Sequence, residues 1–232
     1  MKYKHVGILS AGHMATDINQ GALPAMLPFF IAAYDLSYTA AAAIVFAVNM
    51  SSSVVQPLFG IAADRYSKPW MLPGGMMLAG LGLSLTGLFE GYQWIMALGI
   101  VSGIGIAAYH PEAARLVNLA AGNRKSSAMS IFGIGGTIGF TIGPIIVSTA
   151  MLQWELGGTL VLIIPVTIMS MVIISHFPLF EALETINNEK DAASTTEVVK
   201  ENWSAFSRLA IIVSGRSVRF LWGVFDFPVR PD

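Results

Sequence analysis

Long apolar stretches separated by short polar connectors make up the first 180 residues of the chain. A helix needs roughly 20 apolar residues to cross the hydrocarbon core of a bilayer. Six stretches reach that length, and they cover residues 6–33, 38–63, 71–89, 93–113, 127–150 and 157–178. No strand is expected, because polar and apolar residues alternate nowhere for more than a few positions. The pattern predicts an all-α, polytopic membrane protein built as a bundle of six transmembrane helices.

The pattern changes after Phe180. Residues 181–204 are rich in Glu, Asn and Asp, which predicts a solvated cytoplasmic linker. Residues 205–214 then resemble the beginning of a seventh span, but Arg216 and three more charged residues follow within sixteen positions. Each charge near the centre of a membrane helix costs about 2.5–3.5 kcal/mol. We therefore expect three parts: a helix bundle over 1–180, a linker over 181–204, and a truncated or aberrant start of a seventh span over 205–232.

Composition agrees with a membrane protein. Charged residues make up only 12% of the 232 residues, and 54% are hydrophobic. Soluble domains carry about 25% charged residues, so the lipid bilayer is the expected surrounding medium. A net charge of −1 gives no basic surface for nucleic acid. Because the chain contains no cysteine, disulfides, thiol nucleophiles and thiolate metal sites are excluded.

The basic residues predict the orientation of the bundle in the membrane. Seven of them flank the predicted spans on one side, namely Lys2, Lys4, Arg65, Lys68, Arg115, Arg124 and Lys125. The opposite loops contain Asp35, Glu90 and Glu155 but no Lys or Arg. Because Lys and Arg accumulate in cytoplasmic loops, the amino terminus is predicted to be cytoplasmic. We expect an integral protein of the inner or plasma membrane.

Two of the predicted spans carry matching polar faces. The first span contains four polar residues within one arc of about 100°, and the second repeats the same relative spacings. The residues are His13, Thr16, Asp17 and Gln20 in the first span and Asn49, Ser52, Ser53 and Gln56 in the second. One interpretation is that both helices line a water-accessible cavity. The alternative is that these side chains only join neighbouring helices by hydrogen bonds.

His13 and Asp17 are one helical turn apart on this face. Side chains at i and i+4 can share a hydrogen bond or a proton. An ionisable residue inside the membrane is a candidate functional residue. We therefore expect this pair to bind and release protons.

The end of the fourth span is also polar. Pro111 is expected to bend or end the helix, because proline removes a backbone hydrogen bond. Glu112 and Arg115 are interpreted as charges that reach the membrane interface. For Tyr109 and His110 the sequence leaves two alternatives open, a place in the cavity or a place in the helix packing.

The predicted fifth span has a glycine face and a polar face. Gly135, Gly139 and Gly143 recur every four residues, which lets a neighbouring helix approach closely. Pro144 adds a bend. The opposite face carries Ser130, Thr137 and Thr141.

Several local motifs resemble the major facilitator superfamily. Gly60, Asp64, Arg65 and Lys68 match the superfamily's loop signature after the second span, with Ser67 in place of its glycine. Gly139-x-x-x-Gly143-Pro144 looks like part of the family's antiporter motif in the fifth helix, although the glycine pair that follows in the family is absent. The usual arginine motif of the fourth helix is not evident.

A closer resemblance is to the fosmidomycin-resistance branch. Residues 13–17 (HMATD) and 21–28 (GALPAMLP) resemble the first helix of that branch, and residues 108–114 (AYHPEAA) resemble the end of its fourth helix. The resemblance runs over residues 5–220 and covers the amino-terminal half of the family's fold. It implies an alternating-access exporter that exchanges protons for small organic compounds, with the substrate held between two six-helix halves. It also implies that the Asp64-type carboxylate helps to close a cytoplasmic gate.

Because the resemblance covers only the amino-terminal half of the family's fold, several interpretations of the function stay open. The chain could form a homodimer, pair with a separately encoded second half, or be a non-transporting remnant. A scaffold or channel-like protein is a further alternative. An enzyme is not expected, because no Gly-x-Ser-Gly, His-x-x-His or His-Glu-x-x-His spacing occurs. His13 and His110 with Asp17 or Glu112 could in principle hold a metal ion, but without such a motif no metal and no cofactor are expected.

Overall fold

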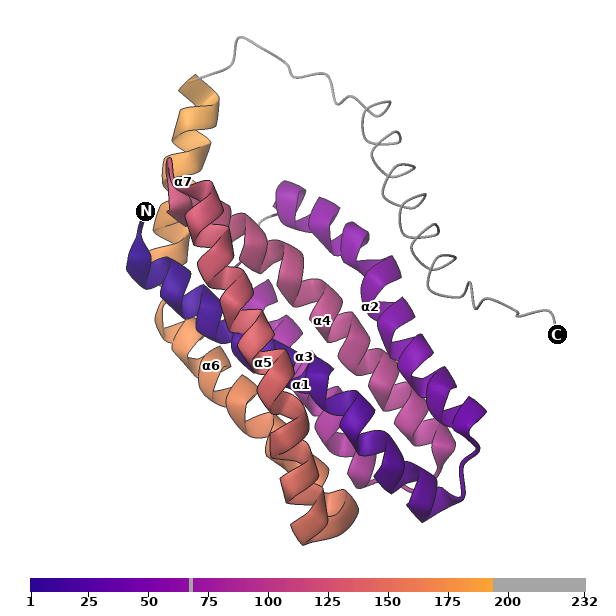
Figure 1. Cartoon of the computed structure of the whole chain (residues 1–232). Helices are drawn as coiled ribbons and strands as arrows, with labels where there is room; N and C mark the ends of the chain where they lie inside the picture. Colours follow the sequence, from indigo (N-terminus) through magenta and orange to yellow (C-terminus); the bar gives the residue numbers. More distant parts are fainter. Residues whose placement is uncertain (67–68, 194–232) are drawn as a thin grey trace, which may run out of the picture. The chain divides into compact units, whose positions relative to one another are not determined.

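The computed structural model describes residues 1–66 and 69–193, and every regular element in that part of the chain is helical. The elements are α1 (Tyr3–Tyr34), α2 (Tyr38–Tyr66), α3 (Met71–Ser84), η1 (Leu85–Gly87), α4 (Tyr92–Ala121), α5 (Lys125–Trp154), η2 (Glu155–Leu162), α6 (Ile163–Ser175) and α7 (Phe177–Ala193) (Figure 1). The all-helical class is thereby confirmed. Lys68, most of the predicted linker's carboxyl half and the predicted part 205–232 lie outside the described residues.

The predicted spans correspond to these elements, but the third, fourth and sixth differ in detail. The third span consists of α3 followed by the 3₁₀ turn η1, and the sixth begins as the 3₁₀ segment η2 before it becomes α6. The fourth helix does not end near residue 113, because Pro111 is accommodated inside α4, which continues to Ala121. In the described residues, three helical stretches are long and apolar enough to cross a membrane: Tyr38–Ala63, Tyr92–Ala121 and Lys125–Ser175.

The most extensive helix contact joins α1 to α5, and α4 packs against both α2 and α3. Glycines of α5 make the first contact possible. A Cβ atom on Gly139 would lie 2.9 Å from Met14 Cα, and one on Gly143 would lie 3.1 Å from Ala22 N. Because a methyl group has no room there, the two backbones touch directly, as the glycine face predicts.

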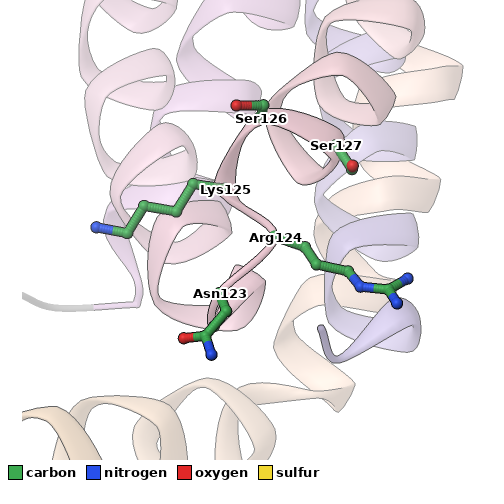
Figure 2. A pocket seen from close by; sticks show the side chains of 6 residues that line it. Asn123, Arg124, Lys125, Ser126 and Ser127 are labelled. Atoms are coloured by element: carbon green, nitrogen blue, oxygen red, sulfur yellow. The ribbon is translucent and has the colours of Figure 1, made fainter.

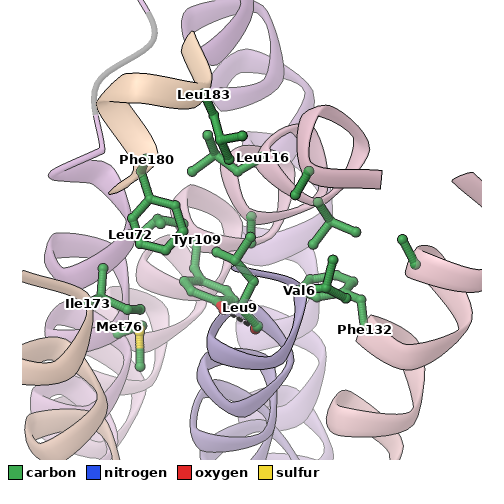
Figure 3. Close-up of a cluster of buried hydrophobic side chains, with 14 of the residues drawn as sticks. Val6, Leu9, Leu72, Met76, Tyr109, Leu116, Phe132, Ile173, Phe180 and Leu183 are labelled. Carbon is green, nitrogen blue, oxygen red and sulfur yellow. Dashed lines mark hydrogen bonds between the residues drawn. The ribbon is translucent and has the colours of Figure 1, made fainter. Parts of the chain in front are cut away.

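A buried apolar cluster joins α1, α3, α4, α5, α6 and the first turns of α7 (Figure 3). Tyr109 and Phe180 lie at its centre, and neither is accessible to solvent. The Tyr109 hydroxyl donates a hydrogen bond to the Leu9 carbonyl at 3.0 Å. Leu183 also belongs to this cluster, so the first residues of the segment predicted to be a solvated linker pack on the helix bundle.

Candidate functional site

The Asp17 carboxylate lies between two imidazoles that come from different helices. Its Oδ2 atom is 3.2 Å from His13 Nε2, one turn earlier on α1, and its Oδ1 atom is 3.1 Å from His110 Nε2 on α4. The two imidazole rings are 4.9 Å apart and nearly perpendicular. The three side chains are between 12% and 18% exposed. We call these three residues the Asp17 cluster.

Backbone carbonyls hold the far nitrogen of each imidazole. His13 Nδ1 is 2.9 Å from the Phe132 carbonyl on α5, and His110 Nδ1 is 2.8 Å from the Ile106 carbonyl one turn back on α4. The His13 ring also stacks on the Phe132 ring, with centroids 4.1 Å apart. A carbonyl oxygen only accepts hydrogen bonds, so each Nδ1 is assigned the proton. In a neutral imidazole, Nε2 then carries a lone pair.

The hydrogen count of the Asp17 cluster follows from this assignment. The four polar contacts of the two rings need four hydrogen atoms, and two neutral imidazoles supply only the two on Nδ1. Both Nε2 lone pairs would then face oxygens of Asp17. The cluster is therefore built to hold additional positive charge between the Nε2 atoms and the carboxylate.

A groove of about 320 Å³ between α1 and α5 gives access to the Asp17 cluster. On the α1 side it is lined by His13, Asp17 and Gln20, so three of the predicted cavity residues share one surface. The α5 side contributes Gly133, Gly136, Thr137, Phe140 and Thr141. The threonines of the predicted polar face therefore do line a hollow next to the charged residues.

Gly136 keeps this groove open, and the sequence analysis did not identify it. A Cβ atom at this position would lie 2.6 Å from His13 Nε2 and 2.7 Å from Asp17 Oδ2. Any side chain would therefore displace the Asp17 cluster. One feature of the sequence points to this role. Gly136 does not belong to the four-residue spacing of the glycine face, so helix packing on that face does not explain why it is a glycine.

The other predicted cavity residues lie elsewhere. Tyr109 is fully buried in the apolar cluster, where its hydroxyl joins α4 to α1, so the packing alternative describes it. Asn49 and Gln56 are exposed on α2, which packs mainly on α4. The structure does not bring these two α2 residues to the groove that His13 and Gln20 line.

The predicted gate motif lies at the end of α2. Asp64 and Arg65 belong to the last turn of this helix rather than to a loop, since α2 extends to Tyr66. Gly60 faces α4, because a Cβ atom there would be 3.8 Å from Pro111 Cβ. The helix end that carries the motif is therefore next to the bend-prone part of α4.

Glu112 and Arg115 do not reach outward as expected. The Glu112 side chain is fully buried, and both of its oxygens accept hydrogen bonds from Arg115, at 3.1 Å from Nε and 2.9 Å from Nη2. Arg115 Nη2 also donates to Glu184 on α7. A buried charge needs a partner of opposite sign, so these residues bind each other instead of the membrane interface.

A second hollow, of about 540 Å³, lies at the connection between α4 and α5 (Figure 2). It shares no residue with the groove beside Asp17. In Figure 2 the side chains of Arg124 and Lys125 point to opposite sides of this connection. The Arg124 guanidinium instead lies 3.4 Å from the Tyr3 hydroxyl. The two charges therefore do not converge on one ligand position.

A bundle of long apolar helices with a polar groove between two of them is the architecture of an integral membrane protein. The family model for the Major Facilitator Superfamily matches residues 9–227, and the chain belongs to that superfamily. The resemblance noted in the sequence is thereby confirmed.

Curated relatives support the same assignment. The chain is 26% identical over 197 residues to the fosmidomycin resistance protein of Escherichia coli (strain K12), a match that covers 85% of this chain and 48% of that protein. It is 34% identical over 150 residues to YfnC, an uncharacterized MFS-type transporter of Bacillus subtilis (strain 168), which covers 65% of this chain and 36% of that protein. The chain thus spans about half or less of the length of these relatives.

A solved structure shows the same fold. The crystal structure of tetrameric PepTSo2 matches this chain with a TM-score of 0.62 and 16% sequence identity. The match covers 100% of this chain and 55% of that one. At this identity, the likeness shows the architecture of the helix bundle and nothing about the substrate.

Proposed function

We propose that this chain forms the amino-terminal half of a secondary active exporter, which moves small organic compounds by alternating access in exchange for protons. Family membership and the printed name of the Escherichia coli relative, which refers to resistance to a small organic compound, support export. The family resemblance supports the proton as the coupling ion. The observation that carries the proposal is the polar groove between α1 and α5, where Asp17 meets two histidines.

Six membrane spans are part of this proposal. They correspond to α1, α2, α3 with η1, α4, α5, and η2 with α6. Large apolar side chains on outward-facing positions support a lipid environment, for example Phe46 on α2, Ile145 on α5 and Ile168 on α6. The split of basic residues supports a cytoplasmic amino terminus.

A second six-helix half would complete the transport path. In this fold the substrate lies between two halves that share the same orientation, related by an axis along the membrane normal. A second copy of this chain or a separate polypeptide could take that position. Exposed apolar residues on α2 and α5, such as Leu58 and Phe140, support such a contact. Cross-linking in native membranes followed by mass measurement separates one copy from two.

We assign the two family motifs to the conformational change. Gly60, Asp64, Arg65 and Lys68 would close the cytoplasmic gate, as the resemblance implies for this signature. Gly139, Gly143 and Pro144 would let α5 shift or bend against α1, because backbone contact without interlocking side chains resists movement weakly.

Transport by everted membrane vesicles tests the proposal. Vesicles that contain the full chain should accumulate labelled fosmidomycin when the lumen is acidic, and a protonophore should abolish the accumulation. Asp17→Asn should remove it, whereas the matched variant Asp35→Asn should not, because Asp35 lies in the connector after α1 at a φ of 50° that asparagine also tolerates. Accumulation that is unchanged by the protonophore contradicts proton exchange. Flux without saturation or counterflow contradicts a carrier and supports a channel.

A further inference from the structure

The candidate ligand atoms of the Asp17 cluster lie close together. One nitrogen each from His13 and His110 and one oxygen from Asp17 lie within 4.8 Å of one another. Two imidazoles and one carboxylate form a common set of three protein ligands for zinc and related transition metals. His13 Nε2 lies 3.2 Å from Asp17 Oδ2, and His110 Nε2 lies 3.1 Å from the other oxygen, Oδ1. Each separation suits a nitrogen and an oxygen that bind the same ion at about 2.0–2.2 Å, with the carboxylate reaching the ion through either or both oxygens.

The surroundings of both histidines also match those of metal ligands. A metal-binding histidine usually donates its second ring N–H to a backbone carbonyl or carboxylate, which fixes the tautomer and the ring orientation. His13 does so with Phe132, and His110 does so with Ile106. Both hydrogen bonds leave the lone pair of Nε2 directed at Asp17, where a cation would lie.

A divalent cation could also take the place of the two hydrogen atoms that the four contacts of the imidazole rings lack. Without it, two lone pairs face a carboxylate unless two extra protons are bound. One divalent ion coordinated by both Nε2 atoms and by the carboxylate removes this repulsion while both imidazoles stay neutral. The net charge is then +1, the same as with two extra protons and an ionised Asp17. The cluster therefore accommodates a divalent ion without further change in charge.

The groove provides an entry path and an open coordination position. His13 and Asp17 line it, and Gly136 opposite them has no side chain to cover the ligand atoms. A water molecule or a ligand oxygen could occupy the remaining position, as in metal sites with three protein ligands.

We propose that His13, Asp17 and His110 bind one divalent transition-metal ion of the zinc type between α1 and α4, with a coordination position open to the groove. The sequence includes these three residues among those that could hold an ion, but it predicts no metal because no local ligand motif occurs. The ligands instead come from two helices, with Asp17 and His110 93 residues apart. The proposal concerns the groove of the proposed transporter, but its test needs no transport, so the two can fail separately.

Cobalt binding tests the site in the full chain, purified in detergent without a histidine tag and stripped with a chelator. Titration with Co²⁺ should produce visible absorption bands that saturate at one ion per chain, and Zn²⁺ should displace the Co²⁺. Mg²⁺ should not compete, because it prefers oxygen ligands in octahedral geometry. If the chain gives no saturable bands with Co²⁺ up to about 1 mM, an affinity too weak for a built site, the cluster holds protons only and the proposal is wrong.

Variants locate the binding. His13→Gln, His110→Gln and Asp17→Asn should each weaken Co²⁺ binding by about 100-fold or more, since loss of even an outer partner typically costs 10–100-fold. His176→Gln is the matched control, because the His176 ring also contacts a backbone carbonyl, that of Val172, at the end of α6. Circular dichroism and size-exclusion chromatography check that each variant is folded. Binding that survives all three cluster variants would assign the metal to another place and overturn the proposal.

Discussion

His110 on α4 reaches Asp17 on α1 across 93 residues of sequence, with 3.1 Å between Nε2 and Oδ1. This contact joins two helices at the groove, and His13 adds α5 through the Phe132 carbonyl. The Asp17 carboxylate thus connects α1 directly to α4, and through the His13 ring to α5.

Gly136→Ala should impair the site with little effect on the fold. The added methyl group would lie within 3 Å of His13 Nε2 and Asp17 Oδ2, so the cluster must shift. We expect transport in vesicles to fall at least about 10-fold, because displacement of functional groups by 1 Å can cost roughly 100-fold. Gly7→Ala is the control, since Gly7 does not line the groove and a Cβ atom there meets nothing within 4 Å. Equal transport by both variants would show that the cluster geometry is unimportant.

Gly139→Ala should destabilise the contact between α1 and α5. Its Cβ atom would lie 2.9 Å from Met14 Cα, and backbone atoms cannot move aside as a flexible side chain can. Overpacking of this kind typically costs about 1–3 kcal/mol of unfolding free energy. Thermal unfolding in detergent measures the loss, with Gly7→Ala again as the control. That control should be as stable as the parent or more so, because alanine favours the helix over glycine.

Glu112→Gln should be among the most destabilising single changes at a charged residue. The change removes the negative charge of Glu112, which accepts hydrogen bonds from Nε and Nη2 of Arg115. The guanidinium itself stays largely buried. Loss of one partner of a buried ion pair costs about 3–5 kcal/mol when the other charge is left alone. Because Arg115 keeps its contact with Glu184, we expect a loss below that range. Glu90→Gln provides the comparison, since Glu90 is exposed and should tolerate the change. The two variants are compared by chemical denaturation in detergent. Similar stability would mean that the pair contributes little.

Tyr109→Phe should cost less, about 0.5–1.5 kcal/mol, which is the usual net contribution of one hydrogen bond. The ring remains in the apolar cluster, but the Leu9 carbonyl loses its donor. The matched change Tyr38→Phe, at a side chain that is 85% exposed, should leave the unfolding temperature unchanged. A loss for Tyr109→Phe as large as that for Glu112→Gln would indicate a further role for the hydroxyl.

The sequence pattern identified the helices and part of the site, because both follow from spacing along one helix. His13 and Asp17 could be paired from their i, i+4 relation alone, and the close approach of another helix at Gly139 from its glycine spacing. Which helix supplies a third partner depends on packing between distant segments, so His110 remained an open alternative.

The failures of the sequence analysis have the same physical origin. Helical periodicity shows that Asn49 and Gln56 share a face of α2, but not which part of the bundle that face meets, so their place in a cavity stays a prediction. Glu112 was placed at the interface because its partner Arg115 and the α7 residue Glu184 converge only in the folded bundle. The Phe132 carbonyl that orients His13 is a backbone atom, and side-chain motifs cannot reveal it.

The attachment of α7 has a mechanical consequence. Phe180 is embedded among the bundle helices, and Glu184 is bound to Arg115 on α4. A pull or twist applied to the first turns of α7 is therefore transmitted to α4 at Arg115, little more than one helical turn beyond His110. A force on the chain after α6 would therefore act on α4, the helix whose His110 contacts the Asp17 carboxylate.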